Sequence, residues 1–105
     1  MNFKEMASDL GFDENDFTEL AQLLVTTSLS DLKKLENGVG LKNADEVAKA
    51  AHSIKGAAGN LGFIKISTVA AEIESDARRG SLVGIEKKIK TIKAGLDLII
   101  TAIDK

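Results

Sequence analysis

His52, the only histidine of the chain, is the residue best suited to chemistry. A histidine side chain is largely neutral near physiological pH, and its free ring nitrogen is a nucleophile that forms covalent intermediates. Lys55 follows it by three residues, so a helix would place the ammonium group on the same side as the imidazole. A lysine beside a nucleophilic imidazole can neutralise an oxygen of a transferred phosphoryl group. The pair therefore predicts a residue that carries an anionic group.

The rest of the sequence supplies no second set of catalytic groups. It contains no further histidine, no motif for binding nucleotide phosphates and no cluster with metal-ligand spacing. The absence of cysteine excludes disulfides and thiolate metal sites. We therefore expect a carrier that is not an enzyme and has no cofactor of its own. The group on His52 would come from one molecule and leave to another.

Size and composition indicate one globular domain over residues 1–105, with 44% hydrophobic and 29% charged residues. A formal net charge of -2 gives no basis for nucleic-acid binding. No stretch approaches the roughly 18 apolar residues of a membrane span. The first residues include Lys4, Glu5 and Asp9 where a signal peptide has its apolar middle region. These features predict a cytoplasmic protein, and the low net charge with a closed core favours a monomer.

Composition and periodicity predict an all-α fold. The chain has no proline, and only 4% of its residues are aromatic. Apolar residues recur at helical spacing in five segments, which predicts helices over 3–10, 15–37, 43–60, 65–79 and 83–104. The four longer helices would form an antiparallel up-down-up-down four-helix bundle, with the short accessory N-terminal helix covering one end.

Capping residues mark where these helices should begin and end. Asn43 is expected to cap the third helix, with Glu46 placed to complete a capping box. Glycines are expected to end three helices: Gly38 and Gly40 the second, Gly62 the third and Gly80 the fourth.

The third predicted helix directs His52 away from the core. At 100° per residue, its apolar stripe is centred about 140° from the histidine. That stripe consists of Val47, Ala51, Ile54, Ala58 and Leu61. A glycine inside a helix costs about 0.5–1 kcal/mol relative to alanine. Gly56 and Gly59, both on the His52 side, are therefore easiest to explain if a partner must approach the helix backbone there.

The run His-Ser-Ile-Lys-Gly-Ala-Ala-Gly-Asn-Leu-Gly resembles the signature of histidine-containing phosphotransfer (HPt) domains. It is also similar to the phosphorylated N-terminal domain of chemotaxis histidine kinases. The positions in register are His52, Lys55, Gly56, Gly59 and Gly62. The resemblance implies a four-helix bundle that accepts a phosphoryl group from the aspartate of a receiver domain and passes it to another receiver. It also implies no kinase activity, with the magnesium of the transfer held by the receiver.

The resemblance assigns a role to each matching residue. His52 would carry the phosphoryl group, Lys55 would stabilise it, and Gly56 would give a partner access. Gly59 and Gly62 match structural positions of the motif. Glu74 lies where chemotaxis-type domains have a glutamate near the imidazole, and it is a candidate to bond one ring nitrogen and leave the other to attack. The alternative is a solvated residue on the flank of the fourth helix.

Two further groups have more than one interpretation. The residues expected to contact a partner are Ala48, Lys49, Gly56, Gly59 and Phe63. Phe63 would supply apolar surface for docking a receiver, unless it is buried between helices. The pair Arg78-Arg79 is either an anion or partner contact or, more simply, a solvated pair that complements the helix dipole.

Three functions are compatible with these observations. The first is a phosphocarrier whose partners are response-regulator receiver domains, with a hybrid sensor histidine kinase as a further candidate. The second is the phosphoacceptor domain of a chemotaxis-type kinase, phosphorylated from ATP by a separate catalytic domain. The third is a docking module that is never phosphorylated, which the intact His52, Lys55 and Gly56 argue against. Whether the chain is a stand-alone protein or an excised domain is left open.

Overall fold

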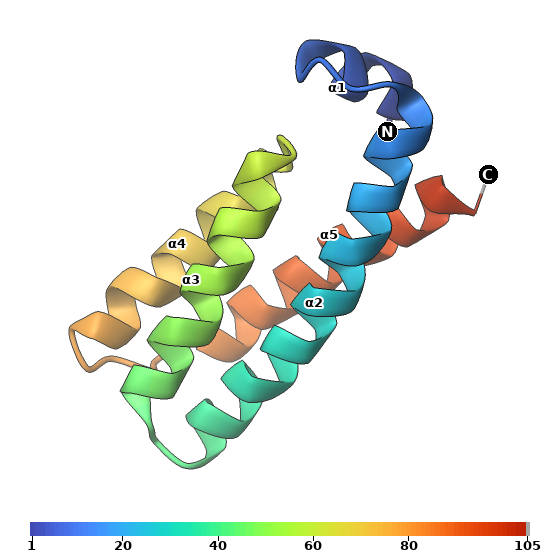
Figure 1. Cartoon of the computed structure of the whole chain (residues 1–105). Coiled ribbons are helices and arrows are strands. Elements are labelled where there is room, and N and C mark those ends of the chain that lie inside the picture. Colours follow the sequence, from blue (N-terminus) through green and yellow to red (C-terminus); the bar gives the residue numbers. More distant parts are fainter. Residues whose placement is uncertain (105) are drawn as a thin grey trace.

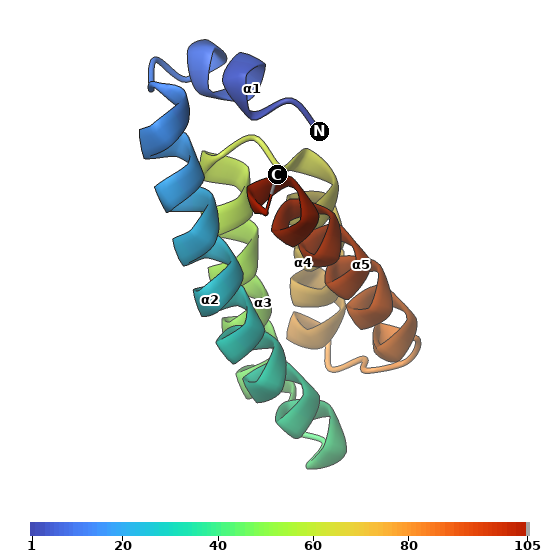
Figure 2. The same cartoon turned by 90° about the vertical axis from the view of Figure 1, so that its right-hand side faces the viewer.

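The computed structural model describes residues 1–104. Its helices are α1 (Phe3–Asp9), α2 (Glu14–Gly40), α3 (Ala44–Asn60), α4 (Ile64–Arg78) and α5 (Ile85–Ile103). Helices α2 to α5 alternate in direction and form a closed ring in which each packs against two neighbours, while α1 packs against α2 (Figure 1). The N-terminus and the end of α5 lie at the α1 end in both views (Figure 2). The predicted all-α bundle with an accessory helix is confirmed.

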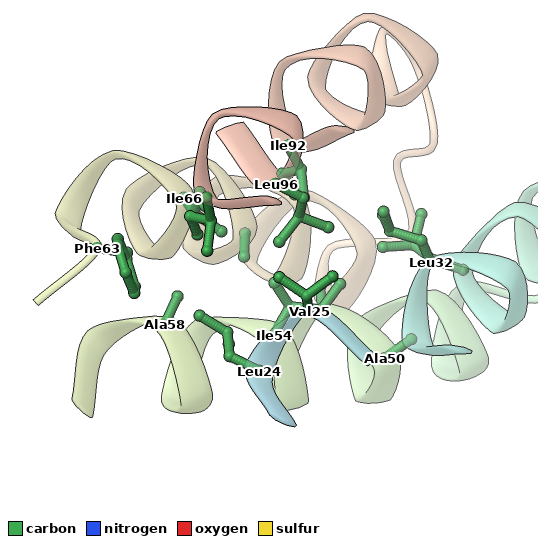
Figure 3. Close-up of a cluster of buried hydrophobic side chains, with 14 of the residues drawn as sticks. Leu24, Val25, Leu32, Ala50, Ile54, Ala58, Phe63, Ile66, Ile92 and Leu96 are labelled. Atoms are coloured by element: carbon green, nitrogen blue, oxygen red, sulfur yellow. The ribbon is translucent and has the colours of Figure 1, made fainter. Parts of the chain in front are cut away.

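The core lies along the axis of the ring and is built from the apolar stripes of all four long helices. Leu24, Ile54, Ile66 and Leu96, one from each helix, point toward one another in Figure 3 and are buried. Each such side chain contributes about 1.5–3 kcal/mol through removal of its surface from water. The stripe predicted for α3 is buried throughout, which fixes the rotation of this helix and turns its opposite side outward.

The α2–α3 corner differs from the prediction. Helix α2 passes through Gly38, which was expected to end it, and ends at Gly40. A Cβ atom on Gly38 would lie 2.8 Å from Val47 Cγ2, so this glycine allows α2 and α3 to approach closely. The chain leaves the helix at Lys42, whose φ of 56° is the left-handed conformation that usually follows a helix.

Asn43 caps α3 as predicted, because its Oδ1 accepts a hydrogen bond of 3.2 Å from the Glu46 amide. The capping box is wrong, since the Asn43 amide donates to the Gly38 carbonyl at 2.7 Å and not to the Glu46 side chain. The predicted stops at Gly62 and Gly80 are correct, with φ of 83° and 81°. Gly84 (φ 75°) delays the start of α5 to Ile85.

Three phenylalanines join α1 to the bundle. The ring centroids of Phe3 and Phe17 are 5.2 Å apart, and those of Phe17 and Phe63 are 6.0 Å apart. Phe63 is only 6% exposed, because Phe3 of α1 and Phe17 of α2 pack against it. It is therefore buried between helices, and its expected role in docking a partner is wrong. Within residues 1–104 none of the helices is both long and apolar enough to cross a membrane.

Candidate functional site

His52 lies in the middle of α3, on the side facing away from the core. Ala51 and Ile54 on either side of it are completely buried. The His52 side chain itself keeps 61% of its surface exposed. The packing of α3 therefore holds the backbone rigidly and leaves the imidazole accessible to another molecule.

A carboxylate from α4 holds the imidazole. His52 Nδ1 is 2.9 Å from Glu74 Oε2. The other oxygen of Glu74, Oε1, accepts a hydrogen bond of 2.6 Å from Lys55 Nζ. Arg78 donates to Oε2 through Nε at 3.1 Å and through Nη2 at 2.7 Å. The structure thus joins the three residues that the sequence placed near the site, and adds Arg78.

Glu74 is a buried carboxylate whose charge is compensated by its neighbours. Its side chain is 8% exposed. Burial raises the pKa of Glu74, but hydrogen bonds from Lys55, Arg78 and His52 outweigh this effect and lower the pKa from 4.5 to about 2. Glu74 is therefore ionised at neutral pH and can only accept hydrogen bonds.

The ionised state of Glu74 determines the tautomer of the imidazole. A carboxylate has no proton to donate, so Nδ1 of His52 must carry the hydrogen of the 2.9 Å bond. In a neutral ring the lone pair is then on Nε2. Among residues 1–104, no side chain or backbone group is hydrogen-bonded to Nε2. The nucleophilic nitrogen is therefore free of hydrogen bonds within these residues, on a side chain that is 61% exposed.

The model of the Hpt domain family matches residues 19–103. The chain belongs to the Hpt domain family. It is therefore a histidine phosphotransfer carrier of a phosphorelay, and receiver domains are the class of partner with which Hpt proteins interact.

A solved structure supports the fold of this Hpt domain. This chain is similar to the crystal structure of histidine-containing phosphotransfer protein B (HptB) from Pseudomonas aeruginosa PAO1, with a TM-score of 0.84 and 23% sequence identity. The match covers 99% of this chain and 90% of that chain. Among proteins with curated descriptions, none matches the sequence significantly.

The three glycines of the Hpt motif serve different purposes. Gly62 has a φ of 83°, which other residues rarely adopt. A Cβ atom on Gly59 would lie 3.1 Å from Ser67 Oγ, so Gly59 allows α4 to approach α3. A Cβ atom on Gly56 would meet nothing within 4 Å. Neither internal packing nor backbone conformation therefore explains Gly56, which leaves space on the surface beside the imidazole.

The structure also places the other residues expected at the docking surface of this Hpt domain. Lys49 and Gly59, three residues before and seven residues after His52 on α3, are both exposed. Ala48 is only 2% exposed, so its expected contact with a partner is wrong. Helix α3 packs against both α2 and α4, and its buried surface is wider than the single apolar stripe suggested.

Arg78 is the residue of the site that sequence reasoning missed. The sequence favours a solvated pair Arg78-Arg79 over an anion or partner contact, whereas in the structure Arg78 donates hydrogen bonds to Glu74. The two residues are four apart on α4, a spacing typical of ion pairs, so this signal was present in the sequence. What the sequence could not show is that His52 and Lys55 converge on the same carboxylate.

Proposed function

We propose that Nε2 of His52 is the atom that carries the phosphoryl group. It would accept the group from an aspartyl phosphate of one receiver domain and pass it to the aspartate of another. One observation supports this more than any other: a buried, ionised Glu74 holds Nδ1 at 2.9 Å while the ring is 61% exposed. This arrangement fixes the nucleophilic tautomer and directs its lone pair toward a partner.

The transfer step uses the imidazole alone as nucleophile. The Nε2 lone pair forms the N–P bond, and the electron pair of the P–O bond leaves with the aspartate carboxylate of the donor. The ring acquires positive charge and keeps its proton on Nδ1, where Glu74 stabilises it through the existing hydrogen bond. In the second transfer the N–P electron pair returns to Nε2 as the carboxylate of the next receiver attacks phosphorus. No proton has to leave the site in either direction.

Lys55 and Gly56 complete the site on the same side of α3. The Lys55 ammonium lies one turn from His52 and is 35% exposed, so it can reach an oxygen of a phosphoryl group on the ring. Gly56 has open space where a side chain would project, which allows the surface of a receiver to come close to Nε2. Catalysis in such a step comes mainly from positioning and charge neutralisation.

The domain would have no kinase or phosphatase activity and no cofactor of its own. Magnesium would be held by the receiver, where the acidic aspartate lies. Within residues 1–104 no three His, Cys, Asp or Glu side chains are grouped so as to hold a metal ion. We expect a monomer that docks through a small, transient interface around α3, because the carrier must release each partner.

Phosphotransfer from radiolabelled receiver domains tests the proposal. Wild-type protein should acquire acid-labile label from at least one receiver, and His52→Gln should acquire none while remaining helical. Absence of label on the wild type from every receiver would contradict a receiver-to-histidine relay. Labelling only by a chemotaxis-type catalytic domain with ATP would instead favour a kinase phosphoacceptor, and equal labelling of His52→Gln would place the group elsewhere.

A further inference from the structure

The two oxygens of Glu74 have different partners. Oε2 accepts from His52 and, through two nitrogens, from Arg78. Oε1 accepts from Lys55 at 2.6 Å. Arg78 is attached to α4 four residues from Glu74, whereas Lys55 comes from α3. The resting site therefore contains one guanidinium on the same helix as the carboxylate and one ammonium that bridges two helices.

A phosphoryl group on His52 would compete for Lys55. The group brings negative oxygens to a position one helical turn from this lysine, and an ammonium is a compact charge on a flexible chain that can turn toward them. The ammonium has three donors, but when it turns toward the phosphoryl oxygens it moves away from Glu74 Oε1, which it now contacts at 2.6 Å. If Lys55 were the sole cation on Glu74, its movement would leave a carboxylate that is 8% exposed without charge compensation, which is strongly unfavourable.

Arg78 removes this conflict. Its Nε and Nη2 both point at Oε2, and a planar guanidinium that donates twice to a carboxylate is held more rigidly than an ammonium. These two bonds to Oε2 do not involve Lys55, so they can persist when Lys55 turns away. Arg79, the next residue, pairs instead with Asp76 at 2.6 Å and plays no part in the site.

We propose that Arg78 is a positioning residue that holds Glu74 and thereby releases Lys55 to bind the incoming phosphoryl group. The two basic residues have separate tasks: Arg78 is the permanent counter-ion of Glu74, and Lys55 is the one that moves. This inference rests on the proposed role of His52. It assigns a function to Arg78 that acts through Glu74, without contact between Arg78 and the phosphoryl group.

A double-mutant cycle on the full chain tests this inference. The variants are Lys55→Gln, Arg78→Gln and the double variant, with Arg79→Gln as the matched control. The measurement is the initial rate of label transfer from the receiver that phosphorylates the wild type. Each single variant should be slower by roughly tenfold, and the double variant should be little slower than either one, because without Arg78 the lysine stays on Glu74. Arg79→Gln should transfer at the wild-type rate.

The possible outcomes are separable. Unchanged transfer by Arg78→Gln, or an additive loss of roughly a hundredfold in the double variant, would overturn the inference and leave the role of His52 intact. Loss of the protonated Nδ1 in the nitrogen NMR spectrum of Arg78→Gln would also overturn it, since the arginine would then act through the imidazole. If Arg78→Gln does not fold, Arg78→Lys replaces it in the cycle. Its transfer rate should fall by less, and this loss should again not add to that of Lys55→Gln. An unlabelled wild type would contradict the proposed function itself.

Discussion

Two carboxylates of α4 have similar partners but different surroundings. Glu74 binds an arginine of its own helix and a lysine of α3, namely Arg78 and Lys55. Asp76 binds Arg79 of its own helix at 2.6 Å and Lys88 of α5 at 3.1 Å. Each cluster therefore joins α4 to a neighbouring helix through the same types of side chain.

The two clusters differ in burial and in the presence of the imidazole. The Glu74 side chain is 8% exposed and that of Asp76 is 22% exposed. Only Glu74 contacts a histidine, at 2.9 Å. Ion pairs between helices thus do not by themselves indicate a functional site. What marks the Glu74 cluster is a buried carboxylate bonded to an exposed nucleophile, and variants that alter each cluster in the same way test this distinction.

The largest difference in phosphotransfer rate is expected between variants of the two carboxylates. Glu74→Gln removes the negative charge that fixes the tautomer and stabilises the phosphorylated ring, so phosphotransfer should fall by roughly 10- to 100-fold. Asp76→Asn should transfer at the wild-type rate. Initial rates of label transfer from a receiver measure both. Equal rates for the two variants would show that the imidazole does not depend on Glu74.

A smaller difference in phosphotransfer rate is expected between variants of the two lysines, Lys55 and Lys88. Lys55→Gln should slow transfer by roughly tenfold through the loss of one charge near the phosphoryl oxygens. Lys88→Gln should leave the rate unchanged and alter the free energy of unfolding by less than about 1 kcal/mol, as is usual for partly exposed ion pairs. Transfer assays paired with urea unfolding of the same samples check this. An equal loss of transfer in both variants would indicate a general effect of surface charge.

Variants at two glycines test whether a receiver needs the open surface beside the Glu74 cluster. Gly56 and Gly40 are both helical, and a Cβ atom on either would meet nothing within 4 Å. Gly56→Gln should slow transfer several-fold by obstructing the receiver, although it should raise helix stability by about 0.5–1 kcal/mol. Gly40→Gln, at the C-terminal end of α2, should not affect transfer. Normal transfer by Gly56→Gln would remove the evidence for close approach at this position.

The smallest effect concerns stability at acid pH. The pKa of Glu74 is lowered from 4.5 to about 2, so its charged cluster stabilises the fold fully above pH 4.5 and loses this contribution as the pH falls toward 2. The stability difference between wild type and Glu74→Gln should therefore shrink over this range. Urea unfolding of both proteins at several pH values measures it, and a difference that is independent of pH would contradict the assignment.

The sequence predicted what depends on periodicity and single residues. The apolar stripes gave the five helices and directed His52 outward, and Asn43 gave the start of α3. The prediction was wrong where close packing between two helices determines the structure. Gly38 was interpreted as a helix stop because glycine is common there, but in the structure its missing side chain makes room for Val47.

The site was predictable to a similar extent. Glu74 could be chosen as the partner of His52 through a resemblance, but no pattern in one chain shows that side chains from α3 and α4 meet. Ala48 was expected at the surface, and Phe63 either there or buried between helices. Both are buried by neighbouring helices, which a projection of one helix leaves out. The spacing of four residues between Arg78 and Glu74 indicated an ion pair. The role of that pair depends on the contact of Lys55 with the same carboxylate, which only the structure shows.

The central claim is that His52 carries the phosphoryl group on Nε2 while Glu74 holds Nδ1. Nitrogen NMR of the ring tests it directly, because the chain has a single histidine. Both ring signals therefore belong to His52, and their couplings to the two ring C–H protons distinguish Nδ1 from Nε2. We expect the unphosphorylated protein to show a protonated Nδ1, and the protein labelled by a receiver to show phosphorus coupled to Nε2 with Nδ1 still protonated. A protonated Nε2 before transfer, or phosphorus coupled to Nδ1 after it, would contradict the claim.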